Sequence, residues 1–438
     1  MAITIRQEPT TPNQANADLL YVLTSDSSSK AQFQYVMEVS DGSDTYTFKQ
    51  QPNPSNKAVF DVGHMVSDFL DTDKPFKTKE VTVSEGSAKE ISTVFYEEFG
   101  TSTTSSVARH GGVSGSGVYV LNGVVEPNSG DWNFASSSFY TSSVANADDT
   151  FSLQHALTNS PVTQSIRNDE YKTLSFINGN FDDSTTNAQD IFYIQVSWYN
   201  SSGAQIQNND WYNIDSGDAD GGPRTANSQL WNEVYNLQDN TTRLIHVAAG
   251  PKNFDDAGIS IPSTWAYYEI KVTGQADDGL EDGDAIYAQR RYTKSEGECG
   301  YTGTRFAFLN ELGGYDYFSF DLADTKQDNI TRETYEQPFV NYSTGTNSVN
   351  YNKSRRGSKV YSISYDESRT AESNYLSDSE ASWLRELVES PEVFVQEGTD
   401  LLPVVITNTQ FLHKTNPRSQ KLYTLSIQYK LSNQRRSR

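Results

Sequence analysis

Apolar and polar residues alternate over short stretches of the chain, which is the pattern of half-buried β-strands. Between residues 33 and 39 every second position is apolar, and the same alternation resumes at Tyr46 and Phe48. The residues between, Asp-Gly-Ser-Asp at 41–44, are typical of a tight turn. The sequence therefore predicts a β-hairpin near its start.

Two segments have the apolar spacing of a helix instead. In residues 62–70 the apolar positions fall on one helical stripe, which predicts a short helix of about ten residues. A second helix is predicted from Ser377 to Ser390, where Ser377 and Glu380 form a capping-box pattern and Pro391 follows the end. Its apolar stripe should cover one face of the C-terminal sheet.

Composition changes along the chain predict its domains. Residues 1–100 should form an N-terminal β-sandwich domain with one short helix, and the small polar residues of 101–117 a Ser/Gly linker. Aromatic strands separated by polar loops predict a jelly-roll-like domain over 118–284. Residues 285–438, where Lys, Arg and Tyr become frequent, should form a C-terminal β domain with the capped helix. The predicted fold class is mainly β, with several β-sandwich or jelly-roll-like domains and one or two short helices.

Charge and apolar content exclude some classes of partner. The chain has 34 basic and 57 acidic residues, a formal net charge of −23, which disfavours nucleic acid because binding phosphate requires excess Lys and Arg. Apolar runs are only a few residues long, so no membrane span of roughly 18 to 20 residues is expected. Aromatic residues make up 12% of the chain and supply the large side chains that a folded core needs.

Motifs for catalysis are missing from the sequence. The five histidines have no zinc-binding spacing, and the chain contains neither a G-x-S-x-G elbow nor a phosphate-binding loop. We therefore expect no enzymatic activity and no cofactor, although paired carboxylates of a glycosidase leave no spacing signature. Two acidic loops with glycines could bind calcium, and their candidate ligands are Asp218, Asp220, Asp282 and Asp284. The alternative interpretation is a pair of solvated acidic turns.

Several segments at both ends resemble virion proteins of tailed bacteriophages, in particular tail and baseplate components of phages from marine and Bacteroidetes hosts. The similar segments are Tyr21 to Asp26, Pro52 to Pro54, Phe60 to Leu70, Phe308 to Phe320, Trp383 to Val395 and Pro403 to Phe411. They lie in the first 70 residues and in the last third of the chain, and they contain no catalytic motif. The resemblance implies a structural subunit located in the virion and assembled in the host cytoplasm, with other virion proteins as partners.

The expected function is therefore a distal-tail-like tail or baseplate component, one copy in a homo-oligomeric ring, with possible contact to host-surface glycan. The alternatives are a carbohydrate-binding surface protein or glycan-active enzyme, and a capsid decoration protein. A predicted contact lies at Gly313 and Gly314, whose tight turn would present Tyr315 and Tyr317 to a neighbour. The opposing hypothesis places both tyrosines in the protein's own core.

Overall fold

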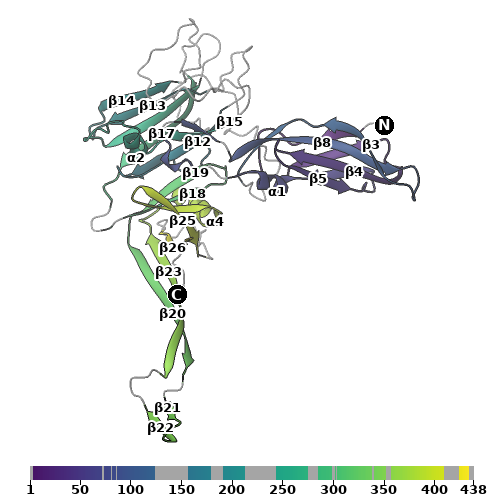
Figure 1. Cartoon of the computed structure of the whole chain (residues 1–438). Coiled ribbons are helices and arrows are strands. Elements are labelled where there is room, and N and C mark those ends of the chain that lie inside the picture. The colour runs from purple at the N-terminus through teal and green to yellow at the C-terminus, as the bar shows by residue number, and fades with distance from the viewer. Residues whose placement is uncertain are drawn as a thin grey trace, which may run out of the picture. The chain divides into compact units, whose positions relative to one another are not determined.

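β-Strands account for most of the described structure, as the sequence predicts. The computed structural model describes residues 3–71, 74–79, 81–84, 86–123, 156–178, 191–212, 243–274, 285–297, 301, 303–337, 340–351, 357–408 and 424–433. The chain divides into two units, and Figure 1 shows the strands and helices along it. Unit 1 comprises Met1–Glu296 with Leu309–Asp316, and unit 2 comprises Gly297–Phe308 with Tyr317–Arg438.

The N-terminal part of unit 1 has two sheets around one apolar core. One sheet has the order β1 (Ile3–Gln7), β3 (Leu20–Ser25) and β6 (Lys57–Asp61). The other has the order β2 (Asn13–Gln14), β10 (Val118–Leu121), β8 (Ala88–Gly100), β4 (Ala31–Ser40) and β5 (Thr45–Gln50). The predicted hairpin is confirmed as β4 and β5, and the alternating residues Phe33, Tyr35, Met37 and Val39 are buried.

The predicted first helix is present but short. It consists of α1 (Gly63–Val66) continued by a 3-10 turn, η1 (Ser67–Phe69), and a second 3-10 turn, η2, covers Pro75–Lys77. Val66 and Phe69 are buried in the same core as β4 and β8. The stripe identified in the sequence therefore faces the core as expected.

The linker predicted over 101–117 is wrong for its central part. Residues Ala108–Ser114 form β9, which pairs with β8 in antiparallel register. Most of its residues are exposed and only Val113 is an apolar residue packed against the core, so no apolar alternation marks the strand.

The remainder of unit 1 consists of two further sheets. The larger has the order β11 (Thr163–Ile166), β17 (Ala285–Lys294), β16 (Tyr267–Gly274), β13 (Ile191–Tyr199) and β14 (Gln205–Tyr212). The smaller has the order β12 (Thr173–Asn178), β15 (Arg243–Ala248) and β7 (Val81–Val83). Trp198, Trp265 and Tyr268 pack between these strands and α2 (Pro251–Asp256).

Two predicted domain boundaries differ from this arrangement. β7 lies within the predicted N-terminal domain, yet it pairs with β15 of the central region. β17 begins at Ala285, where the C-terminal domain was expected, yet it lies between β11 and β16. The basic composition that suggested a boundary includes Arg290, which is buried and donates hydrogen bonds to the Ser160 and Pro161 carbonyl oxygens.

Unit 2 is built on one seven-stranded sheet, which also includes Leu309, Tyr315 and Asp316 of unit 1. Its order is β19 (Tyr315–Phe320), β18 (Thr304–Leu309), β24 (Val393–Glu397), β25 (Asp400–Ile406), β26 (Ser426–Leu431), β23 (Ser358–Glu372) and β20 (Asp324–Glu336). Between β20 and β23 the chain forms a small hairpin of β21 (Val340–Ser343) and β22 (Ser348–Tyr351).

The predicted C-terminal helix is confirmed, divided into α3 (Asp378–Trp383) and α4 (Arg385–Glu389). Both halves of the capping box form: Ser377 Oγ accepts from the Glu380 N–H, and the Glu380 carboxylate accepts from the Ser377 N–H at 2.8 Å. Trp383, Leu384 and Leu387 pack on the sheet, as predicted. Among the described residues, no helix combines the length and apolarity needed to cross a bilayer.

Candidate functional site

A long two-stranded ribbon extends from the sheet of unit 2 (Figure 1). β26 pairs with β23 only at Arg369–Glu372, so residues 358–368 of β23 pair with β20 alone. We call residues 324–336 of β20 together with residues 358–368 of β23 the arm. All thirteen residues of β20 are exposed, and at roughly 3.3 Å per residue the strand is about 40 Å long.

The pairing register gives the arm two different faces, because residues directly opposite one another lie on the same side. One face, here the apolar face, carries the pairs Asp328–Glu367, Ile330–Tyr365 and Arg332–Ile363. The other, the polar face, carries the pairs Asn329–Asp366, Thr331–Ser364 and Glu333–Ser362. Apolar contacts are therefore available on one face along the middle of the ribbon.

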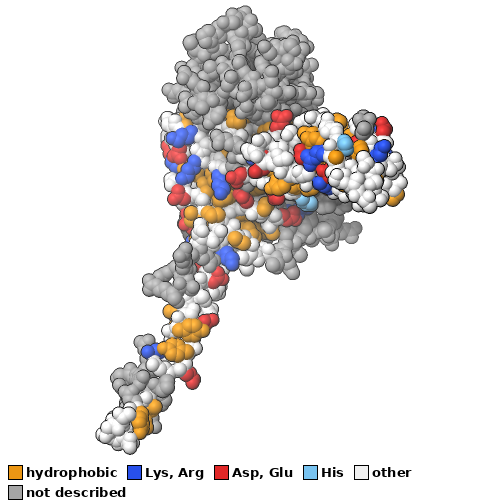
Figure 2. Space-filling model, turned by 45° about the vertical axis from the view of Figure 1, so that its right-hand side comes forward, with side chains coloured by type: hydrophobic (Ala, Val, Ile, Leu, Met, Phe, Trp, Pro, Cys, Tyr) orange, Lys and Arg blue, Asp and Glu red, His pale blue; other side chains and the backbone are white. Residues whose placement is uncertain are grey.

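Large apolar side chains are concentrated in the outer half of the arm and in the hairpin that follows it. Figure 2 shows hydrophobic side chains along this part of the surface. The exposed apolar residues are Ile330, Tyr335, Val360, Tyr361 and Ile363 in the arm, with Tyr342 and Val349 opposite one another in the β21–β22 hairpin. Tyr361, 62% exposed, lies at a bulge in the ladder and packs edge-on against Tyr335. Clusters of exposed apolar side chains are common on surfaces that bind another molecule.

The face that we call apolar carries charged side chains at the end of the arm that joins the sheet. Glu367 Oε2 lies 2.7 Å from Lys326 Nζ, and Glu367 Oε1 accepts from Arg369 at 2.7 Å. The hydrogen bond from Lys326 lowers the pKa of Glu367 below its usual value. Tyr365 donates to Asp328 at 2.6 Å, and this bond raises the pKa of the tyrosine to about 12. These bonds fix the side chains at the base of the arm.

The long edges of the arm are open in the described part of the chain. β20 is the last strand of its sheet, so its outer edge has no partner strand among the described residues. Residues 324–336 contain no proline, and the bulge lies in the opposite strand. Proteins commonly protect such edges with prolines, bulges or charged side chains, because unpaired N–H and C=O groups pair readily with another strand. Of these, β20 has only the charged side chains, and because they are of both signs, a strand with complementary charges is able to pair with its edge.

The structure disagrees with the predicted contact at Gly313 and Gly314. It agrees with the opposing hypothesis, in which this segment is a turn and both tyrosines are buried. Tyr315 and Tyr317 are 3% and 2% exposed, so neither presents its ring at the surface. Tyr315 packs edge-on against Phe76, and the Arg305 guanidinium lies over the Tyr317 ring. The turn itself is closed by Asn310, whose Oδ1 accepts from the N–H groups of Leu312 and Gly314.

The calcium candidates Asp218, Asp220, Asp282 and Asp284 lie outside the described residues. Within the described ranges, no group of three or more His, Cys, Asp or Glu side chains is placed to hold a metal ion.

Two polar clusters in unit 1 contain the residue types of active sites, and sequence reasoning identified neither. Ser175 Oγ lies 2.9 Å from His246 Nδ1, on directly opposed positions of β12 and β15. Thr158 donates to Asp316 at 2.6 Å in a second cluster, which also includes Arg290 through Ser160. All of these side chains are at most 4% exposed. In each cluster, buried polar side chains bond to one another, which is the usual arrangement of polar groups inside a folded protein.

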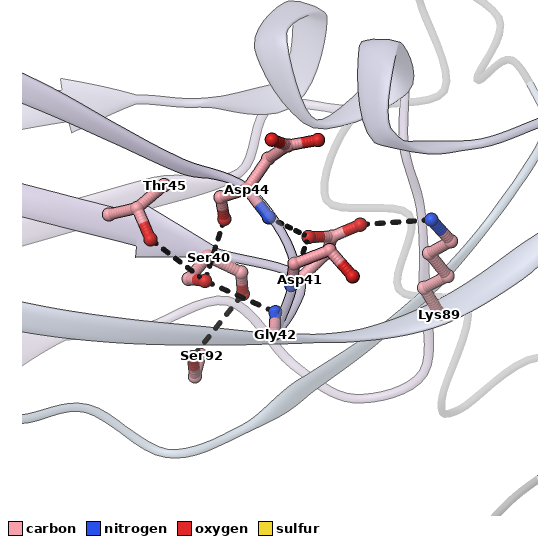
Figure 3. Close-up of polar contacts among 8 residues, drawn as sticks. Ser40, Asp41, Gly42, Asp44, Thr45, Lys89 and Ser92 are labelled. Atoms are coloured by element: carbon pink, nitrogen blue, oxygen red, sulfur yellow. Dashed lines mark hydrogen bonds and ion pairs between the residues drawn. The ribbon is translucent and has the colours of Figure 1, made fainter.

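A third cluster surrounds the carboxylate of Asp41 at the β4–β5 turn (Figure 3). Asp41 Oδ1 accepts from the N–H groups of Ser43 and Asp44 at 3.0 and 2.8 Å, and Oδ2 accepts from Lys89 at 2.9 Å. The backbone bond from Asp44 and then the bond from Lys89 lower the pKa of Asp41 to about 2. Because one of its oxygens is engaged by the turn and the other by Lys89 of β8, the role of this carboxylate is structural.

The arm is thus the described feature best suited to a function, and the chemistry it offers is binding. Comparison with known proteins adds no further constraint. No protein-family model matches the sequence, and no curated protein matches it.

Proposed function

We propose that this chain is a structural subunit of a larger assembly, a tail or baseplate component of a tailed-phage virion, and that the arm makes its assembly contacts. The observation that carries the proposal is the exposed ribbon of β20 and β23 with its apolar outer half. The virion assignment rests on the segments that resemble phage tail and baseplate proteins, among them Phe308 to Phe320 and Trp383 to Val395.

The physical argument concerns the stability of the arm. An isolated two-stranded ribbon is marginally stable in water, and three or more strands or a packed face are needed for stability. The arm has exposed apolar side chains and contributes none of them to the core of unit 2. Contact with a neighbouring protein would bury this surface and supply the missing strand or face.

An arm deletion tests the proposal. Asn329 and Asp366 are opposite one another, so residues 330–365 can be replaced by an Asn-Gly turn that joins them. We expect the full chain to associate into dimers or larger assemblies in negative-stain images and light scattering, and the deletion variant to stay monomeric. Its melting temperature should be unchanged, because the core of unit 2 takes no residue from the deleted segment.

Two results would count against a structural role. One is association that persists after the arm is removed. The other is a full chain that remains monomeric at every concentration while it turns over or tightly binds a glycan, which is the expected behaviour of the carbohydrate-active alternative. If the deletion lowers the melting temperature, the same association measurement is made on the double variant Tyr335→Ser with Tyr361→Ser. This variant is more conservative because it removes only exposed rings.

A further inference from the structure

We propose that the partner of the arm is a second copy of this chain, and that the two β20 edges pair in antiparallel orientation about a two-fold axis at Ile330. This inference rests on the proposed function and specifies the contact. In such a pair each residue faces the residue equally far on the other side of the centre, so 328 faces 332 of the partner copy. The two ribbons would form one four-stranded sheet.

Charge complementarity favours this register. Asp328 of each copy would face Arg332 of the other, giving two ion pairs beside the centre on the same face. Arg332 is exposed and has no ion-pair partner among the described residues. Asp328 bonds with Tyr365 through one oxygen, Oδ1, and a carboxylate has a second oxygen to offer.

Apolar contact favours the same centre. Ile330 lies opposite Tyr365 and next to the Arg332–Ile363 pair on the apolar face. With the axis at Ile330, the isoleucines of the two copies would touch, and the apolar face would continue from one copy to the other. Diagonal neighbours in antiparallel pairs are close enough for such side chains to interact.

Neighbouring registers fit less well. A centre at Asn329 would place Lys326 opposite Arg332, two like charges. A centre at Thr331 would pair Lys326 with Glu336, but Lys326 already binds Glu367, and Ile330 would then face a charged arginine. In the proposed register Asp324 and Glu336 face each other at both ends, where repulsion should limit the pairing to about Lys326–Thr334.

Charge reversal tests the pairing with the full chain, followed by sedimentation velocity over a series of concentrations. Asp328→Arg would place two arginines opposite each other, and Arg332→Asp would place two aspartates opposite each other. Each variant should therefore have a dissociation constant at least about tenfold higher than that of the natural chain. An equimolar mixture of the two variants should associate again, because every facing pair in the mixed dimer is then Arg with Asp. The double variant Asp328→Arg with Arg332→Asp should likewise recover association.

The matched control is Asp366→Arg, the same charge change on the polar face of β23, which should associate as the natural chain does. Melting curves establish that each variant is folded. Association of both single variants at natural strength would overturn the pairing, as would failure of the mixture and of the double variant to recover. If the arm deletion abolishes assembly while Asp328→Arg leaves it intact, the arm binds by another register or to another protein. The proposed function would then stand without this inference.

Discussion

At the scale of single residues, Asp41 links a turn to the stability of the fold. Its carboxylate accepts two backbone N–H bonds and one from Lys89, so Asp41→Ala should cost about 1–3 kcal/mol at pH 7. The folded pKa of about 2 lies below the unfolded value, so this stabilisation is complete above about pH 4 and is lost as the pH falls toward 2.

Melting temperatures between pH 7 and pH 3 check this prediction. The gap between Asp41→Ala and the natural chain should be widest at neutral pH and narrow below about pH 4. Asp44→Ala is the control, because Asp44 enters the turn network through its backbone groups. Equal losses for the two variants would show that the side-chain bonds of Asp41 contribute little.

Gly313 is a position where no other residue fits. Its φ is +88°, and a Cβ atom there would lie 1.7 Å from the Asn122 carbonyl oxygen. Gly313→Ala should therefore cost at least about 2 kcal/mol, from the left-handed backbone and the forced displacement of Asn122. Gly345→Ala, which has open space around it, should leave the melting temperature nearly unchanged. A stable Gly313→Ala variant would mean that this turn can move without cost.

At the scale of elements, substitutions at the capping box measure how much one helix terminus contributes to the free energy of unfolding. Ser377→Ala removes the acceptor for the Glu380 N–H and should cost about 1 kcal/mol. Ser382→Ala is the same substitution at an exposed position inside α3, where alanine's higher helix propensity should give a neutral or slightly stabilising effect. Chemical denaturation of the two variants measures both. A loss of equal size in both would exclude the cap as the cause.

The same scale explains which elements the sequence could predict. The β4–β5 hairpin and the capped helix are visible because turn residues and buried stripes are local signals. β9 and β20 are not, because both lie largely in solvent and so lack the alternation that one buried face imposes. Arg290 is the opposite case. Its charge predicts a position at the surface, yet the side chain is buried and donates hydrogen bonds to carbonyl oxygens. The arm is not predicted as a site from the sequence, because β20 is exposed at every position and carries no such alternation.

At the scale of the whole molecule, the chain passes between its units at residues 308–309 and 316–317, as well as near Gly297. The segment Leu309–Asp316 belongs to unit 1, where Leu312 packs in a small apolar cluster with Leu121, Leu157 and Leu244. Trp383 packs in the separate core of unit 2, against Phe308 and Phe318. Separate cores make two unfolding transitions the expected behaviour in calorimetry.

Core substitutions assign those transitions. Leu312→Ala should cost about 2–5 kcal/mol and lower only the transition of unit 1, because the cavity it creates is confined to that unit's cluster. Trp383→Ala should cost about 3–5 kcal/mol and lower only the other transition. If each variant instead shifts a single common transition, the units unfold together. Cooperativity would then pass through the chain crossings around Leu309–Asp316, and the two cores would not be thermodynamically separate.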